Sequence, residues 1–197
     1  MEKKHGEEEQ EMYYRLLEAA LEAFNEKGAK FTLEDISKRL NISKKTIYTE
    51  FSGKQELMAT MIDQGFQEVK REEEKIVSHR ELSTLEKIRK IVIVIPEAYR
   101  NMNFQKIATL QESYPKLYRK IQKYIEQEWD LTIGLFEKGM EEGVLRRFPI
   151  PVVKTMIEST MERFLQQQEQ EDFDYIKSLE AMMDIVMKGI EKEDGGQ

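Results

Sequence analysis

The sequence predicts an all-α protein, with an N-terminal three-helix helix-turn-helix domain followed by a C-terminal helical bundle, about nine helices in all. Apolar residues recur at spacings of three and four in almost every stretch, as on one face of a helix. No stretch shows the sustained alternation of a half-buried strand. Only 4 prolines and 10 glycines interrupt the 197 residues, so most of the chain is free to be helical.

Four helices are expected in the first part of the chain. Gly28 is a C-cap that ends the first of them, and Thr32 with Asp35 forms a capping box for the second. Asn41 breaks the second helix because asparagine tolerates a left-handed turn, and Ser43 caps the third. The helices are expected at about 11–26, 33–40 and 43–51, with a fourth that starts at the box-like segment 52–55 and fades in the charge run 70–75.

The second part of the chain continues with helices alone. Ser83 and Glu86 form another capping box, Pro96 interrupts the helix that follows, and Gly143 closes a long one. We expect helices at about 83–100, 104–112, 115–142, 152–168 and 173–191.

The composition excludes several classes of site. The chain has no cysteine, which rules out disulfides and thiolate zinc sites, and neither of its 2 histidines has a second ligand at helical spacing. It has no Gly-rich phosphate loop and no nucleophile–base pair, so we expect no enzyme activity, no metal and no cofactor. No apolar run approaches the ~18–20 residues of a membrane span, and no secretion signal is visible, which favours a cytoplasmic protein.

The charge is unevenly distributed. The formal net charge is -7, yet residues 30–54 carry +3, which leaves -10 on the remaining 172 residues. A locally basic segment on an acidic chain indicates one anionic contact surface.

The helix 43–51 has two distinct faces. Ile47 and Phe51 are four residues apart and are expected to point inward. The outward and flanking positions are then cationic, hydroxylic or aromatic, with no large aliphatic side chain: Lys44, Lys45, Thr46, Tyr48 and Thr49. Such groups donate to phosphate oxygens and base edges in a DNA groove. Backbone amides near Ser43, and Lys54 in the first turn of the next helix, are placed to meet phosphates.

The stretch TLEDISKRLNISKKTIYTEFSGKQEL resembles the DNA-binding module of the TetR family of transcriptional regulators. The positions that carry the resemblance are Thr32, Asp35, Ile36, Ser43, Lys44, Thr46, Ile47, Tyr48, Phe51 and Lys54, and the match spans about residues 11–66. The resemblance implies DNA contacts from Thr32, Lys45, Thr46, Tyr48 and Lys54, with Tyr48 and Lys54 on phosphate.

The chain departs from the family pattern at two positions. Asn41 stands at a turn position that is usually glycine, which is physically tolerable. Glu50 stands where the family often has a tyrosine or histidine near phosphate. Either Glu50 turns away from DNA, or it accepts a hydrogen bond from a base amine, or DNA binding is weaker than usual; we favour the first.

By resemblance, residues 1–54 form the DNA-binding domain, with the helix-turn-helix at about 32–51, and residues 55–197 form an effector-binding and dimerisation domain. Two apolar stripes near the C-terminus suit a four-helix interface across a two-fold axis. The alternative is that both stripes pack only within one subunit. The predicted interface residues are Met156, Ile157, Thr160, Met161, Phe164, Leu179, Met183 and Val186.

The sequence indicates the effector pocket less clearly than the DNA-binding helix. Apolar and aromatic side chains are common in small-molecule sites, but at helical spacing they also form ordinary core. The candidates are Met61, Ile95, Tyr99, Phe104, Tyr124, Trp129 and Phe136. No charged pair stands within the apolar stripes, so a hydrophobic or amphipathic effector is expected.

These observations predict a homodimeric DNA-binding transcriptional regulator. We expect a repressor that a small-molecule effector releases from a near-palindromic double-stranded operator. The competing hypothesis is a helical protein-interaction bundle without specific DNA binding, whose lysines are merely solvated.

Overall fold

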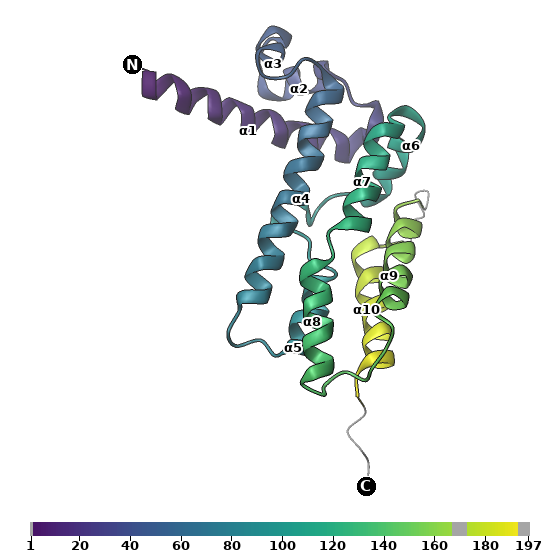
Figure 1. The fold of residues 1–197 in the computed structure, drawn as a ribbon. Coiled ribbons are helices and arrows are strands. Elements are labelled where there is room, and N and C mark those ends of the chain that lie inside the picture. The colour runs from purple at the N-terminus through teal and green to yellow at the C-terminus, as the bar shows by residue number, and fades with distance from the viewer. Residues whose placement is uncertain (1, 167–172, 193–197) are drawn as a thin grey trace. The chain divides into compact units, whose positions relative to one another are not determined.

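The computed structural model describes residues 2–166 and 173–192, and side chains from residue 10 onward. Over these ranges the chain is helical throughout, and the only extended pairing is a single bridge between Leu145 and Glu191 (Figure 1). The all-α prediction is therefore confirmed. Within the same ranges no helix combines the length and apolarity needed to cross a membrane.

The chain divides into two compact units. One consists of Met1–Gly65 with Asn101–Ile121, and the other of Phe66–Arg100 with Gln122–Gln197. The predicted domains, 1–54 and 55–197, were divided by expected function and not by compactness. That division stays a prediction.

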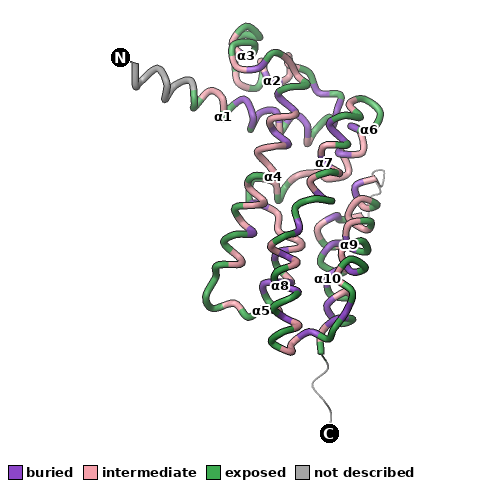
Figure 2. Tube along the Cα trace, viewed as in Figure 1, coloured by how far each residue is buried: buried purple, intermediate pink, exposed green. Residues whose placement is uncertain are grey.

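The first unit is built around the end of α1. Its elements are α1 (Glu2–Lys27), η1 (Gly28–Lys30), α2 (Leu33–Leu40), α3 (Lys44–Glu50), the first part of α4 (Lys54–Ser78), η3 (Phe104–Ala108), α6 (Thr109–Ser113) and the first part of α7 (Pro115–Gln127). Each of the first four α-helices contributes fully buried side chains, among them Leu16, Phe24, Ile36, Ile47 and Leu57. The buried positions recur at intervals along α1 and α4 (Figure 2), as an amphipathic stripe requires.

The local signals around the helix-turn-helix are confirmed. The Thr32 hydroxyl accepts from the Asp35 backbone N–H while the Asp35 carboxylate accepts from the Thr32 N–H, which completes the capping box. Asn41 is left-handed, at φ 52°, and the Ser43 side chain accepts from the Thr46 N–H. Before α4 the pairing differs from the expected one, because Ser52 bonds to Glu56 rather than to Gln55.

The second unit has its own core. Beyond the second part of α4 and the end of α7, its elements are α5 (Thr84–Ile91), η2 (Glu97–Tyr99), α8 (Asp130–Glu141), α9 (Ile150–Leu165) and α10 (Tyr175–Ile190). Ile88, Phe136, Ile157 and Met187 are fully buried within one cluster, so α5, α8, α9 and α10 share a single core. Arg89 joins α5 to the end of α10 through Asp184 and Glu191.

The prediction of one helix over 83–100 is wrong. α5 ends at Ile91, and only the short η2 follows. The ring of Pro96 disfavours helical backbone at the residue before it, and Pro96 itself is extended, with ψ at 149°. The helix is therefore interrupted before Pro96, as predicted. Its last residue is Ile91, so it ends several residues before the proline.

The single helix predicted over 115–142 is also wrong, because the chain forms α7 and α8 with a break at residues 128–129. Trp129 is 7% exposed, and its indole N–H donates to the Ile125 carbonyl at 2.6 Å. A continuous helix would offer that carbonyl to the backbone N–H of the same residue. Burying the indole in the core of the second unit thus accompanies the break.

Candidate nucleic-acid interface

The helix α3 is anchored by two buried side chains. Ile47 is 0% exposed and Phe51, its C-cap residue, is 3% exposed. The Phe51 ring stacks on Tyr13 of α1, with centroids 5.2 Å apart and planes at 24°. The same side of α3 therefore faces the core at both ends of its last turn, which fixes how the helix is rotated about its axis.

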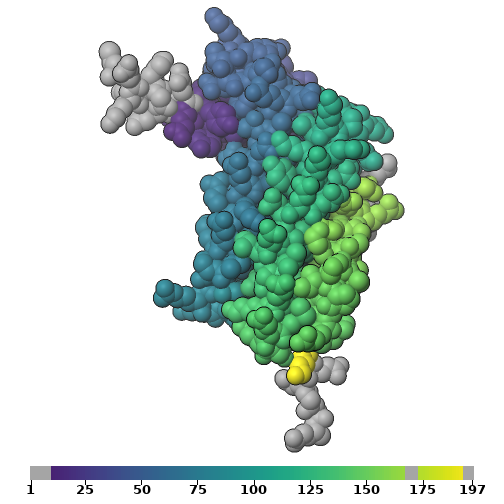
Figure 3. Space-filling model, in the orientation of Figure 1, coloured from purple at the N-terminus to yellow at the C-terminus, as the bar shows by residue number. Residues whose placement is uncertain are grey.

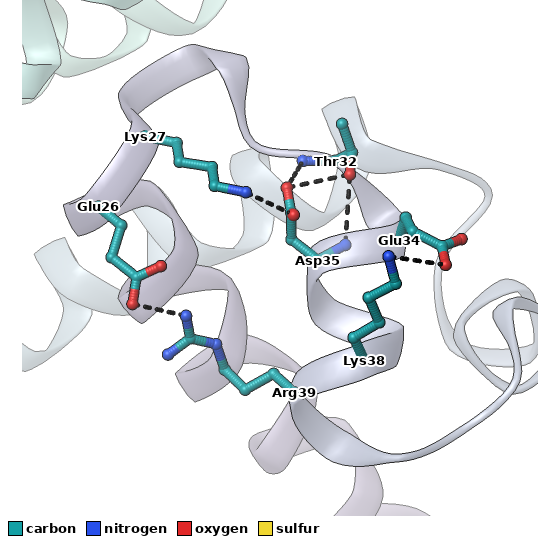
Figure 4. Close-up of polar contacts among 7 residues, drawn as sticks. All are labelled: Glu26, Lys27, Thr32, Glu34, Asp35, Lys38 and Arg39. Carbon is teal, nitrogen blue, oxygen red and sulfur yellow. Dashed lines mark hydrogen bonds and ion pairs between the residues drawn. The ribbon is translucent and has the colours of Figure 1, made fainter.

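Ion pairs hold α2 against α1. Arg39 places one guanidinium nitrogen 2.6 Å from Glu22 and the other 2.6 Å from Glu26. Lys27, at the end of α1, contacts the capping carboxylate Asp35 at 2.6 Å (Figure 4). Because α2 also packs on α3, these ties position the helix that follows the turn at Asn41.

The face of α3 opposite its anchor is open to solvent. Lys44, Lys45 and Thr49 are exposed, and the Tyr48 side chain is 55% exposed. Thr46 is half-buried. In the space-filling view the blue α2–α3 region lies at the surface of the first unit (Figure 3). A face that combines ammonium, phenol and hydroxyl groups offers donors to both phosphates and base edges.

Much of the local positive charge is internally paired. Lys44 lies 2.7 Å from Glu34, and Lys38 lies 3.6 Å from the same carboxylate. The hydrogen bond from Lys44 lowers the pKa of the Glu34 carboxyl, and Glu34 raises the pKa of Lys44. Within the described part of the chain Lys45 has no ion-pair partner, which makes it the cation of α3 best able to meet an external anion.

The hydroxyl candidates have local roles. Thr32 and Ser43 are N-cap residues whose oxygens accept backbone hydrogen bonds. The Thr46 hydroxyl lies 3.1 Å from that of Ser43, and the Thr49 hydroxyl donates to the Thr46 carbonyl at 2.7 Å. Each oxygen retains acceptor capacity, so a structural role and a contact with DNA are compatible.

Lys54 differs from the other candidates because its ammonium has partners inside the protein. It donates to the Ala29 carbonyl at 2.6 Å and lies over the rings of Phe31 and Tyr114, at 4.4 and 5.2 Å from their centroids. The side chain is half-buried.

Glu50 is half-buried at the end of α3. The pKa of Tyr13 is raised, first by burial and then by the negative charges around it, which include Glu56 and Glu50. Glu50 is thus close enough to α1 for its charge to act on that phenol.

The candidate pocket residues fall in both units. Met61 and Phe104 belong to the first unit, and the other five to the second. Trp129 and Phe136 are part of the second unit's core, where Phe136 packs edge-on against Phe148. Tyr124 stacks on Phe66, with centroids 4.2 Å apart. Burial raises the pKa of Tyr99 to about 12.

The candidate dimer residues also separate into groups. Ile157, Leu179 and Met183 are buried within the subunit, and Met156 is 57% exposed. The remaining four are half-buried: Thr160, Met161, Phe164 and Val186.

Sequence reasoning missed three residues that join elements of the first unit. Tyr13 stacks on Phe51, Glu34 pairs with Lys44, and the Asn25 side chain bonds the backbone at Asn101 and Asn103. Tyr13 precedes the apolar stripe of α1 by one helical turn, which was a usable signal. The other two contacts join separate elements and leave no periodic pattern.

The candidate interface lies in a segment that matches a known protein family. Residues 16–61 match the model of the tetR family of bacterial regulatory proteins, a span that contains α2, α3 and the buried Ile47 and Phe51. Over residues 16–61 this chain therefore carries a domain of the tetR family of bacterial regulatory proteins.

Similarity to known proteins extends beyond that domain. The uncharacterized HTH-type transcriptional regulator YvaF of Bacillus subtilis (strain 168) is 25% identical over 132 residues, 67% of this chain and 70% of its own. The TetR-family regulator PfmR of Thermus thermophilus has a TM-score of 0.66 at 19% identity, over 90% of this chain and 100% of that one. FadR of Bacillus subtilis, solved in complex with stearoyl-CoA, has a TM-score of 0.63 at 19% identity, over 90% and 99% of the two chains.

The capping carboxylate predicts an acid-dependent loss of stability in this TetR-family domain. Hydrogen bonds from Lys27 and Thr32 hold the pKa of Asp35 at about 2, below its ordinary value. Stability from a lowered pKa is present above the unfolded-state pKa and is lost as pH falls through the folded-state value. Asp35→Asn should therefore melt at a lower temperature than the wild type at pH 6, and this difference should shrink as pH falls from about 4 to about 2. Thermal melts by circular dichroism measure it, and a difference that stays constant with pH contradicts the assignment.

Proposed function

We propose that this regulator is a homodimeric repressor that binds a near-palindromic operator through α3 and is released by a small-molecule effector. The observation that carries the proposal is the two-sided geometry of α3. Ile47 and Phe51 are buried in the first unit, while Lys45, Tyr48 and Thr49 face outward. A short helix held in this way presents a polar face that fits the major groove.

Lys45 is the centre of the proposed contact. Its ammonium has no internal anion among the described residues, whereas Lys44 is paired with Glu34. The exposed Tyr48 lies beside it, with a phenol that reaches phosphate. Lys44 supplies a further phosphate contact when a DNA phosphate replaces Glu34 as the partner of its ammonium. Thr32, Ser43 and Thr46 complete the surface while they retain their capping bonds.

A second copy of the chain is proposed to cover an exposed stripe on α9 and α10. Val152 and Met156 are 53% and 57% exposed on α9, and Ile185 is 73% exposed on α10. Small exposed residues, Ser159 and Ala181, accompany them and allow close approach of helices. Two such helices from each subunit form a four-helix interface, and its two-fold symmetry matches a near-palindromic operator.

We propose a hydrophobic or amphipathic effector that binds within the second unit. Half-buried apolar and aromatic groups there, including Ile95, Tyr99 and Tyr124, combine apolar area with polar tips. The structural likeness to the regulator that was solved with stearoyl-CoA supports a ligand of this class. Trp129 and Phe136 then line the site from the core side.

The recognition helix is tested by substitution. An operator is first selected from a random duplex pool, a step that also reports symmetry and half-site spacing. Lys45→Ala and Tyr48→Ala should each weaken operator binding by about 1–3 kcal/mol, roughly ten- to a hundredfold, because each removes a donor to DNA. Fluorescence anisotropy measures the affinity, and the helical circular dichroism signal should stay unchanged. Affinities equal to the wild type would refute the assignment, and failure of the wild type to bind any duplex at low salt would favour an interaction bundle.

The dimer surface is tested by charge insertion. Met156→Glu and Ile185→Glu should each convert the dimer to monomer, because each would bury an unpaired carboxylate at the interface. Sedimentation velocity measures the mass, with Gln111→Glu on α6 as an exposed control in the other unit. Variants that remain dimeric place the interface elsewhere.

The effector class is tested by release from DNA. Adding stearoyl-CoA to the operator complex should lower the anisotropy of labelled operator, whereas free CoA should leave it unchanged, because apolar burial supplies most of the binding energy. Equal release by both compounds, or by neither, contradicts an effector with a long apolar chain.

A further inference from the structure

The η1 turn is a junction within the first unit. Its central residue, Ala29, is 4% exposed, and both its backbone polar groups are bonded to side chains from distant elements. Its N–H donates to the Thr109 hydroxyl at 2.8 Å, at the start of α6. Its carbonyl accepts from Lys54 at 2.6 Å, at the start of α4. One peptide segment thus connects α6 to α4.

The end of α6 reaches the same lysine from another direction. Tyr114 is the C-cap residue of α6, and its N–H donates to the Leu110 carbonyl at 2.8 Å. Its ring lies 5.2 Å from the Lys54 ammonium, and the fully buried ring of Phe31 lies at 4.4 Å. Ring faces attract cations because their quadrupole is negative there. The ammonium is therefore surrounded by a carbonyl and two aromatic rings.

These partners compete with the phosphate contact that the family resemblance implies for Lys54. A phosphate contact by Lys54 requires its ammonium to leave the Ala29 carbonyl and the rings, or to share its three donors with them. Lys45 has no such competing partners among the described residues. The two lysines differ in what they already bind, although both belong to the same basic segment.

We infer that Lys54 is a positioning residue for DNA binding rather than a phosphate contact: it locks the start of α4 to the η1 turn and to Tyr114. Only residues 51–53 separate α3 from α4, so the anchor of Lys54 also limits how α3 is directed. Asn25 adds a parallel tie, since its side chain donates to the Asn101 carbonyl at 2.8 Å and accepts from the Asn103 N–H. The inference rests on the DNA-binding function proposed above.

The salt dependence of binding separates the two roles. The slope of log K against log salt falls by about 0.9 for each phosphate contact removed. Lys54→Met should lower operator affinity by between about twofold and thirtyfold, as expected for coupling through packed groups, with the slope unchanged. Lys45→Met is the matched control, and it should reduce the slope if its ammonium meets a phosphate.

An uncharged variant tests the same junction. Tyr114→Leu removes a ring that lies against Lys54 but carries no charge, so it should also lower affinity without changing the slope. The double variant should bind more weakly than the wild type by a factor smaller than the product of the two single effects. Each variant is first compared with the wild type by circular dichroism and thermal melting, and Tyr114→Phe serves as the conservative variant that should retain wild-type affinity.

A loss of stability alone would not change which operator is preferred. Affinity is therefore also measured for an operator with one base pair inserted between its half-sites. If Lys54 directs α3, the preference for the original spacing should weaken in Lys54→Met and Tyr114→Leu. A slope reduced by about 0.9 in Lys54→Met, or wild-type affinity in either variant, overturns the inference. A wild type that binds no duplex would instead overturn the proposed function from which the inference starts.

Discussion

The surface that α3 presents depends on the burial of two side chains, Ile47 and Phe51. Because they are four residues apart on one short helix, their burial defines the rotation of every other residue on it. Stacking of Phe51 on Tyr13 extends the anchor to α1. The polar residues of α3 could not offer a consistent face to a partner if this apolar contact were absent.

The ionic contacts of the first unit have a different role. Arg39 and Lys27 are paired with carboxylates of α1 and α2, and Lys44 is paired with Glu34. Pairs of this kind near the surface contribute little stability individually, typically ~0–1 kcal/mol. Their consequence here is selective, since they pair Lys38, Arg39 and Lys44 with carboxylates, whereas Lys45 has no ion-pair partner among the described residues.

The helices α9 and α10 show why an apolar stripe does not by itself define an interface. Ile157 and Met183 occupy the core of their own unit, while Met156 and Ile185 lie exposed on the same two helices. Adjacent residues of a helix point about 100° apart, so the same helix has apolar side chains both in the core and at the surface. The predicted dimer set combined both faces, because a spacing pattern does not tell which apolar side faces its own subunit.

The sequence by itself determined the helical class, the caps at Thr32 and Ser43, the left-handed turn at Asn41 and the inward direction of Ile47, because each depends on neighbours within a few residues. It did not reveal that α7 and α8 are separate, because the break accompanies burial of Trp129 in a core formed by distant helices. Nor did it distinguish Lys44, Lys45 and Lys54 by their contacts, because the sequence does not show which groups surround each ammonium. Only the tertiary structure gave Lys44 a carboxylate and Lys54 a carbonyl and two rings, since these partners come from other elements.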